Sequence, residues 1–425
     1  MHTPVLADET PQLNRARELT IGYADRDILR QLAGQVAEIA PQPIQQEKLD
    51  LWYRHNALEA TRPLVLCFPE NSWDEIIPER MQCEGSLARE WEYQLHKEVF
   101  WGAEMRDDRV ITPYFNVPYT YTETDWGLTV TRIGGKGGGS FTWDAPLEEY
   151  DALEKLRFPQ IQVAYEETAR ELELAQETFG DLLIVRLKYK WLWSEGLADT
   201  LAELRGMQQI AFDMYDHPDD LHRLMAFLRD GRMAKLDFLE ANGLLSLNND
   251  STYIGSGGYG WSNELPRDDF DGHVRLCDLW GFAESQVIVG VSPEMFAEFI
   301  LPYQIALLDR FGLNCYGCCE PVDPWWAAIE KIPRLWRVSV SPWANVPKMA
   351  EHLSDRYIFS WKPHPVDLAM DSFDERAIRA TLRQTFHETR NCRVEAIMKD
   401  THTIRNDPSR VIRWVEIALQ EARAL

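Results

Sequence analysis

The sequence predicts an α/β fold, namely a (β/α)8 TIM barrel with an N-terminal helical extension. The first observation behind this prediction is that eight short apolar runs with strand character follow residue 60 of the 425-residue chain. The second is that most of these runs precede a segment with helical periodicity, and such alternation implies parallel strand pairing. One barrel with insertions accommodates a chain of this length. The predicted strands are residues 63–68, 109–115, 182–187, 243–247, 312–316, 335–340, 357–361 and 393–399.

The helical segments set the domain organisation. Residues 1–60 are expected to form the N-terminal helical extension, and residues 61–425 the barrel. Ser292 followed by Pro293 is typical of a helix start, because Ser caps the helix and Pro suits its first position. The predicted helices are residues 25–39, 44–60, 197–215, 218–242, 293–311, 325–332, 345–353, 372–389 and 408–424.

Two insertions interrupt the repeating pattern. Residues 128–143 contain the glycine-rich run 134–139 between two alternating segments. The run lacks the spacing of a phosphate-binding loop, so a β-hairpin with a glycine tip is the favoured interpretation. The loop 248–266 is rich in Gly, Ser and Tyr, and long loops of this kind are commonly lids or binding loops.

Composition limits the classes of partner. The formal net charge of −24 argues against nucleic acid and against anionic membrane surfaces. No apolar run is long enough to span a bilayer, and the first residues lack a secretory signal pattern. The seven cysteines are odd in number and have no framework spacing, which favours a reducing, cytoplasmic location.

A candidate metal site follows two predicted strands. Cys318 and Glu320 are two residues apart after the strand 312–316, so in extended chain both side chains face the same way. His402 follows the last strand. A catalytic zinc takes three protein ligands and keeps an open position for Lewis-acid chemistry, so we expect zinc at Cys318, Glu320 and His402. Cys319 is the alternative sulfur ligand, and Asp400 is either a ligand or the group that orients His402.

Further polar residues at strand ends are candidates for proton transfer. Asp250 could act as a general acid or base, although an Asx-turn after a strand would explain it equally well. Lys362 and His364 lie in a segment made rigid by two prolines and could bind a carboxylate or protonate a leaving group; a solvated turn is the alternative. Asp400 belongs to this catalytic set as well.

Sixteen tryptophans, many near predicted loops, suggest either ordinary packing or an aromatic-walled cleft for an apolar, aromatic or cationic small molecule. The residues expected to contact a substrate are Trp193, Asn249, Tyr253, Trp343 and Trp361.

Two consecutive motifs carry a family resemblance. Asp278-Leu279-Trp280-Gly281 is followed by Ser292-Pro293-Glu294-Met295-Phe296-Ala297-Glu298-Phe299-Ile300-Leu301-Pro302-Tyr303. With the cysteine loop and the final Asp-Thr-His segment, they resemble the uroporphyrinogen decarboxylase superfamily over residues 60–425. The resemblance implies a (β/α)8 barrel and, in many members, a homodimer.

The departures from the family pattern separate its two branches. The decarboxylases carry an Arg-Gln-Ala-Gly-Arg motif, which is absent here; Pro69-Glu70-Asn71 lies in the comparable loop. The corrinoid-linked methyltransferases bind zinc through a His-x-Cys pair and a later Cys. The resemblance implies a permuted set here, with Cys318 and Glu320 at the pair and His402 near the later position. No corrinoid-binding histidine motif is present, so the resemblance implies a separate corrinoid protein.

Three hypotheses follow. The first is a metal-dependent methyltransferase, or demethylase, that moves a methyl group between a small methylated substrate and the corrinoid protein. The second is a metal-independent decarboxylase or lyase of a small carboxylic acid that uses Lys362, His364 and Asp250. The third is a barrel that only binds a ligand or partner; buried thiols, carboxylate and imidazole without a use make it the least favoured.

Overall fold

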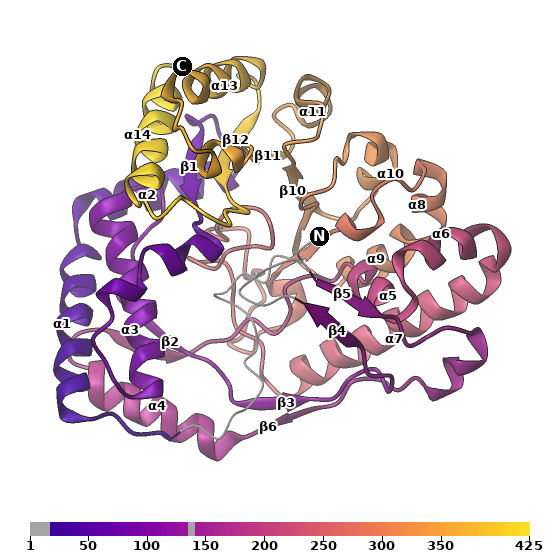
Figure 1. Ribbon diagram of the computed structural model, residues 1–425, viewed down its shortest axis with the longest axis horizontal. Coiled ribbons are helices and arrows are strands. Elements are labelled where there is room, and N and C mark those ends of the chain that lie inside the picture. Colours follow the sequence, from indigo (N-terminus) through magenta and orange to yellow (C-terminus); the bar gives the residue numbers. More distant parts are fainter. Residues whose placement is uncertain (1–17, 135–140) are drawn as a thin grey trace.

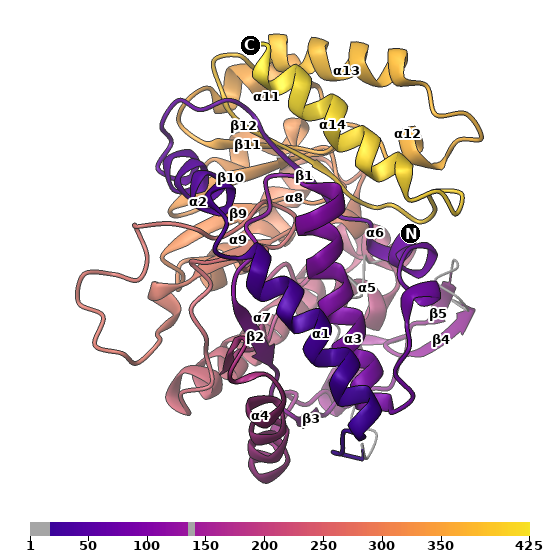
Figure 2. The ribbon, with the colours of Figure 1, turned by 90° about the vertical axis from the view of Figure 1, so that its left-hand side faces the viewer.

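A six-stranded parallel sheet forms the centre of the chain. The computed structural model describes residues 18–134 and 141–425 (Figures 1 and 2). All pairings in the sheet are parallel and follow the order β1-β12-β11-β10-β9-β8, with Val340 opposite Trp361. The strands are β1 (Leu64–Cys67), β8 (Trp280–Ala283), β9 (Leu313–Tyr316), β10 (Leu335–Val340), β11 (Ile358–Trp361) and β12 (Arg393–Met398).

A separate parallel pair, β2 (Tyr114–Val117) with β7 (Ile184–Leu187), completes the parallel strands. The predicted α/β fold with parallel strands is thus present, but in the described residues no ladder joins the two sheets into a closed barrel. The predicted strand 243–247 is not formed, because its polar groups bond side chains. Trp191 Nε1 donates to the carbonyl of Leu244, and the Asn248 amide bonds both backbone groups of Trp280.

Helices cover the sheet. In Figure 1, α13 and α14 lie at the top over β12 and β1, while α1 and α3 run side by side on the left. Two predicted helices are divided, one at Gly206, which has φ 85°, and one at Ile300 before Pro302, whose ring provides no N–H. The helices are α1 (Tyr23–Ile39), α2 (Pro43–Asn56), α3 (Ser86–Val99), α4 (Tyr165–Phe179), α5 (Ala198–Arg205), α6 (Met207–Asp216), α7 (Pro218–Ala241), α8 (Pro293–Phe299), α9 (Leu301–Leu308), α10 (Trp326–Ile329), α11 (Val346–Leu353), α12 (Val366–Ala369), α13 (Glu375–Glu388) and α14 (Ser409–Arg423).

Short helical turns complete the elements. The 3-10 turns are Glu70–Glu75, Pro78–Arg80, Tyr150–Lys155, Leu276–Asp278, Gln286–Ile288 and Asp323–Trp325, and a π turn spans Phe100–Met105. Among the described residues, none of the helices combines the length and apolarity needed to span a bilayer.

Both predicted insertions have a defined arrangement. β4 (Thr131–Gly134) and β5 (Phe141–Asp144) form the expected antiparallel hairpin, and most of its glycine run lies outside the described residues. A second antiparallel pair, β3 (Tyr121–Glu123) with β6 (Ile161–Val163), was not predicted.

The long loop 248–266 folds inward. Tyr253 and Tyr259 form an isolated bridge and are nearly buried. Asn56, at the end of α2, donates to the carbonyl oxygens of Tyr259 at 3.0 Å and Trp261 at 2.6 Å. The loop therefore packs against one face of the sheet and does not extend into solvent as an open lid.

Candidate active site

A buried ionic layer, formed by Arg337, Glu395 and His55, lies against the sheet near the amino ends of its strands. Arg337 Nε lies 3.1 Å from Glu395 Oε1, and His55 Nε2 lies 3.3 Å from Glu395 Oε2; all three side chains are buried. Burial alone would raise the pKa of Glu395, but Arg337 and His55 bring it down to about 2. Arg337 and Glu395 balance each other's charge, and burial lowers the pKa of His55, which indicates a structural layer beneath the site.

Lys362 and His364 occupy different environments. Lys362 is buried and donates from Nζ to the Ser360 carbonyl at 2.9 Å and hydroxyl at 2.7 Å. Burial lowers its pKa to about 7. His364 instead accepts a hydrogen bond from the Val366 N–H and packs edge-on against exposed Trp343, with 5.0 Å between ring centroids. The pair predicted to act together therefore contacts different partners.

A reactive cluster lies at the carboxyl ends of β9 and β12. Cys318 Sγ is 3.5 Å from Cys319 Sγ and 3.4 Å from Lys399 Nζ. Cys319 Sγ donates to Asp400 Oδ2 at 3.4 Å, and Lys399 Nζ lies 3.4 Å from Asp400 Oδ1. The neighbouring Cys319 thiol lowers the pKa of the Cys318 thiol; burial opposes this and the Lys399 ammonium reinforces it. Cys318 is therefore the sulfur that favours the thiolate form.

Glu70, at the carboxyl end of β1, joins this cluster. Its side chain is 7% exposed, and its Oε1 has no hydrogen-bond partner in the described chain. Burial raises the pKa of Glu70 to about 8, and the charge of Asp400 adds to the increase while Lys399 opposes it. A carboxyl with this pKa holds its proton at neutral pH.

Backbone strain coincides with the cluster. Glu70 has φ 48° and Asp400 has φ 57°, in the left-handed region that non-glycine residues rarely adopt. Such conformations cost about 1–3 kcal/mol each and concentrate at functional sites. Two of them lie here, just beyond the carboxyl ends of the paired strands β1 and β12.

The predicted zinc ligands do not form a metal site. Glu320 is buried, and its two oxygens accept the N–H groups of Ser285 at 2.8 Å and Cys318 at 2.9 Å. His402 is exposed, and its Nδ1 lies 3.0 Å from Asn71 Nδ2. Within residues 18–134 and 141–425, no group of three or more His, Cys, Asp or Glu side chains is placed to hold a metal ion. The trio does not fit zinc, because the carboxylate braces the cysteine loop and the imidazole faces solvent.

Asp250 has the surroundings of a fixed counter-ion. Lys188 Nζ lies 2.6 Å from both of its oxygens, and Arg186 Nη2 lies 2.9 Å from Oδ2. Burial is the largest single influence and raises the pKa of Asp250, but Lys188, Thr252 and Arg186 together bring it below its usual value. An ionised carboxylate held by two cations is poorly suited to exchange protons.

Two neighbours of Asp250 on the same loop, Asn249 and Tyr253, make contacts within the protein. Asn249 Nδ2 donates to the Leu265 carbonyl at 2.6 Å. Tyr253 packs its ring 4.3 Å from that of Phe68, and its buried hydroxyl has no hydrogen-bond partner in the described chain. Tyr253 thus remains able to bond a ligand.

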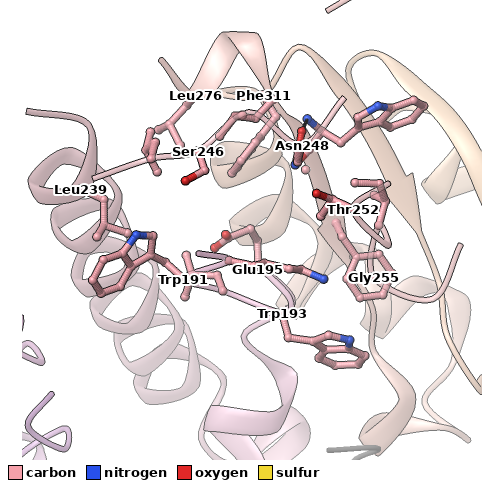
Figure 3. Close-up of a pocket in the computed structure, with 18 of the residues that line it drawn as sticks. Trp191, Trp193, Glu195, Leu239, Ser246, Asn248, Thr252, Gly255, Leu276 and Phe311 are labelled. Carbon is pink, nitrogen blue, oxygen red and sulfur yellow. Dashed lines mark hydrogen bonds between the residues drawn. The ribbon is translucent and has the colours of Figure 1, made fainter. Parts of the chain in front are cut away.

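A cavity opens beside β8, lined in part by Leu245 and Ser246 of the unpaired segment 243–247 (Figure 3). Its volume is about 80 Å³. Trp193 lines it and packs edge-on against Phe282, 5.2 Å between centroids. Phe282, which lines the cavity, and Cys318 belong to one packed hydrophobic cluster, but neither Cys318 nor Cys319 lines the cavity.

The other predicted substrate contacts lie elsewhere. Trp343 is 68% exposed and outside the cavity. Trp361 is 4% exposed and packs against Phe386 of α13, on the outer face of the sheet.

Three residues were not among the predicted site residues: Glu70, Glu195 and Lys399. Lys399 ends a predicted strand immediately before Asp400, which is the signal that could have identified it.

Comparisons with known proteins give little further guidance. No protein-family model matches the sequence, and no curated protein matches it either. Among solved structures, a methyltransferase from Methanosarcina mazei matches with a TM-score of 0.49 and 11% sequence identity. The match covers 89% of this chain and 98% of that one. A likeness this distant assigns no activity.

Proposed function

We propose that this chain is an enzyme that moves a methyl group from a small methylated substrate to a separate corrinoid protein. The observation that carries the proposal is Glu70, a buried carboxyl with an unpartnered oxygen beside Lys399 and the Cys318–Cys319 pair. The family resemblance of the sequence and the largely apolar cavity beside β8 support it.

The chemistry requires a proton at the leaving atom. When the methyl–heteroatom bond breaks and the corrinoid accepts the methyl group, negative charge develops on the heteroatom. Glu70 holds a proton at neutral pH and would donate it there, and the Lys399 ammonium would stabilise the developing charge. General-acid catalysis of this kind typically contributes about 10²–10⁴-fold.

The thiols have a supporting electrostatic role. Lys399 pairs with Asp400 and lowers the pKa of Cys318, and the negative charge of Asp400 helps to keep Glu70 protonated. The step needs only the proton of Glu70 and the methyl acceptor. No part of it depends on zinc at Cys318, Glu320 and His402.

The test uses free cobalamin, chemically reduced, as the methyl acceptor and a panel of O-methyl and N-methyl aromatic compounds as donors. Formation of methylated cobalamin, followed by absorbance, should depend on the protein. Glu70→Gln should lower the rate by about 10²-fold or more. Glu79→Gln, an exposed carboxylate in the same segment, is the matched control and should leave the rate unchanged. Equal rates in all three proteins would refute the role of Glu70.

A further inference from the structure

Few charged side chains line the cavity beside β8. Three charged side chains line it: Lys188, Lys190 and Glu195. Lys188 is paired with Asp250, and Lys190 Nζ donates to the Tyr253 carbonyl at 2.9 Å. The cations are therefore already satisfied by the protein.

Glu195 differs from these cations. Its side chain is 3% exposed, and its Oε2 has no hydrogen-bond partner among the described residues. Arg232 Nη1 lies 3.8 Å away, beyond hydrogen-bonding range, and donates instead to the Ser194 carbonyl. A buried acceptor without a donor costs about 1–3 kcal/mol, so a bound molecule that supplies a donor would remove this cost.

The backbone fixes where this carboxyl lies. The Glu195 N–H donates to the Phe282 carbonyl of β8 at 2.7 Å, which ties the segment after β7 to the sheet. Figure 3 shows the Glu195 side chain in the middle of the labelled residues, between Trp191 and Thr252. The carboxyl is thus presented to the cavity by paired backbone.

The remaining walls are apolar and largely aromatic. Trp191 is itself held by its hydrogen bond to Leu244, and Trp193 packs on Phe282. Rings fixed in this way form a rigid aromatic lining, which favours a ring-shaped ligand because little side-chain freedom is lost on binding. The aromatic lining consists of Tyr189, Trp191, Trp193, Trp280, Phe282 and Phe311.

We propose that this cavity binds a flat, mainly apolar ring that carries one O–H or N–H donor, and that Glu195 Oε2 accepts the hydrogen bond from that donor. Glu195 is then the residue that determines specificity. This inference rests on the proposed function only in identifying the ring as the methyl donor, for example a methoxyphenol or an N-methylated arylamine.

The test measures binding without any methyl acceptor, by isothermal titration calorimetry. The probes are ortho-methoxyphenol and methoxybenzene, which lacks the hydroxyl donor and adds no bulk. The wild-type protein should bind ortho-methoxyphenol about tenfold or more tightly than methoxybenzene. N-methylaniline against N,N-dimethylaniline is the second arm and distinguishes an N–H from an O–H ligand.

Variants of Glu195 test whether its carboxyl group causes the preference for the probe that carries a donor. Glu195→Leu should bind ortho-methoxyphenol and methoxybenzene equally, whereas Glu195→Gln, which keeps an acceptor oxygen, should retain part of the preference. Should the leucine variant fail to fold, the wild-type and glutamine proteins still give the comparison. Equal binding of donor and donorless probes by the wild-type protein, or an unchanged preference in Glu195→Leu, would overturn the inference. Selective binding without methyl transfer would instead contradict the proposed function and leave this site intact.

Discussion

Replacing Glu70 by Gln should change how the stability of the protein depends on pH. The pKa of Glu70 rises from 4.5 to about 8 on folding because the side chain is buried beside Asp400. The folded state therefore binds the proton more tightly than the unfolded state. The stability that this proton provides is complete below the unfolded pKa and is lost as the pH rises through about 8.

The magnitude follows from the two pKa values. Between about pH 6 and about pH 9, the unfolded carboxyl is ionised throughout while the folded one ionises near the end of the interval. This group then lowers the free energy of unfolding by about 2–3 kcal/mol across the interval. The uncharged amide of Glu70→Gln has no such titration, so the variant should be less sensitive to alkaline pH by that amount.

Urea titrations of both proteins at the two pH values give the free energies of unfolding directly. Glu79→Gln, which is exposed, serves as the control and should follow the wild-type protein. Parallel pH dependence of the wild-type and Glu70→Gln proteins would show that the folded protein does not hold this proton, and would refute the reasoning.

Three further predictions concern neighbouring groups. Glu395→Gln leaves the buried Arg337 without its counter-charge and should cost about 3–5 kcal/mol of stability, measured by urea unfolding; a loss below about 1 kcal/mol would contradict the ionic layer. Gly255→Ala should destabilise the protein strongly, because φ is 56° and the new methyl group would overlap the Phe282 ring; an unchanged melting temperature would contradict this packing. Lys399→Met removes a cation that lowers the pKa of Cys318, so the thiolate absorbance should develop at higher pH than in the wild-type protein; coincident titrations would exclude that interaction.

Much of the fold could be predicted from periodicity. The strand predicted at 335–340 has the same bounds in the structure, because an apolar run between a helix and a turn is a strong signal. β8 was missed, since its four residues include a glycine and carry no alternating pattern. The segment 243–247 has strand composition but lies unpaired, because Asn248 replaces the ladder with side-chain hydrogen bonds. Composition does not show which backbone groups a side chain such as that of Asn248 will bond.

The site was predicted in part. Strand-end position selected the segments that carry Cys318 and Asp400, and the structure brings these two residues together through Cys319. Strand-end position does not reveal that Glu320 accepts hydrogen bonds from two backbone N–H groups, or that His402 is exposed to solvent. Those outcomes depend on tertiary placement, which residue type and spacing do not encode.

The pH dependence of methyl transfer tests the central claim most directly. If Glu70 supplies the proton, the rate of methylated cobalamin formation by the wild-type protein should be constant at neutral pH and fall as the pH rises through about 8. The Glu70→Gln protein should be slow and lack that fall. A wild-type rate that stays constant or increases through this range would contradict the account.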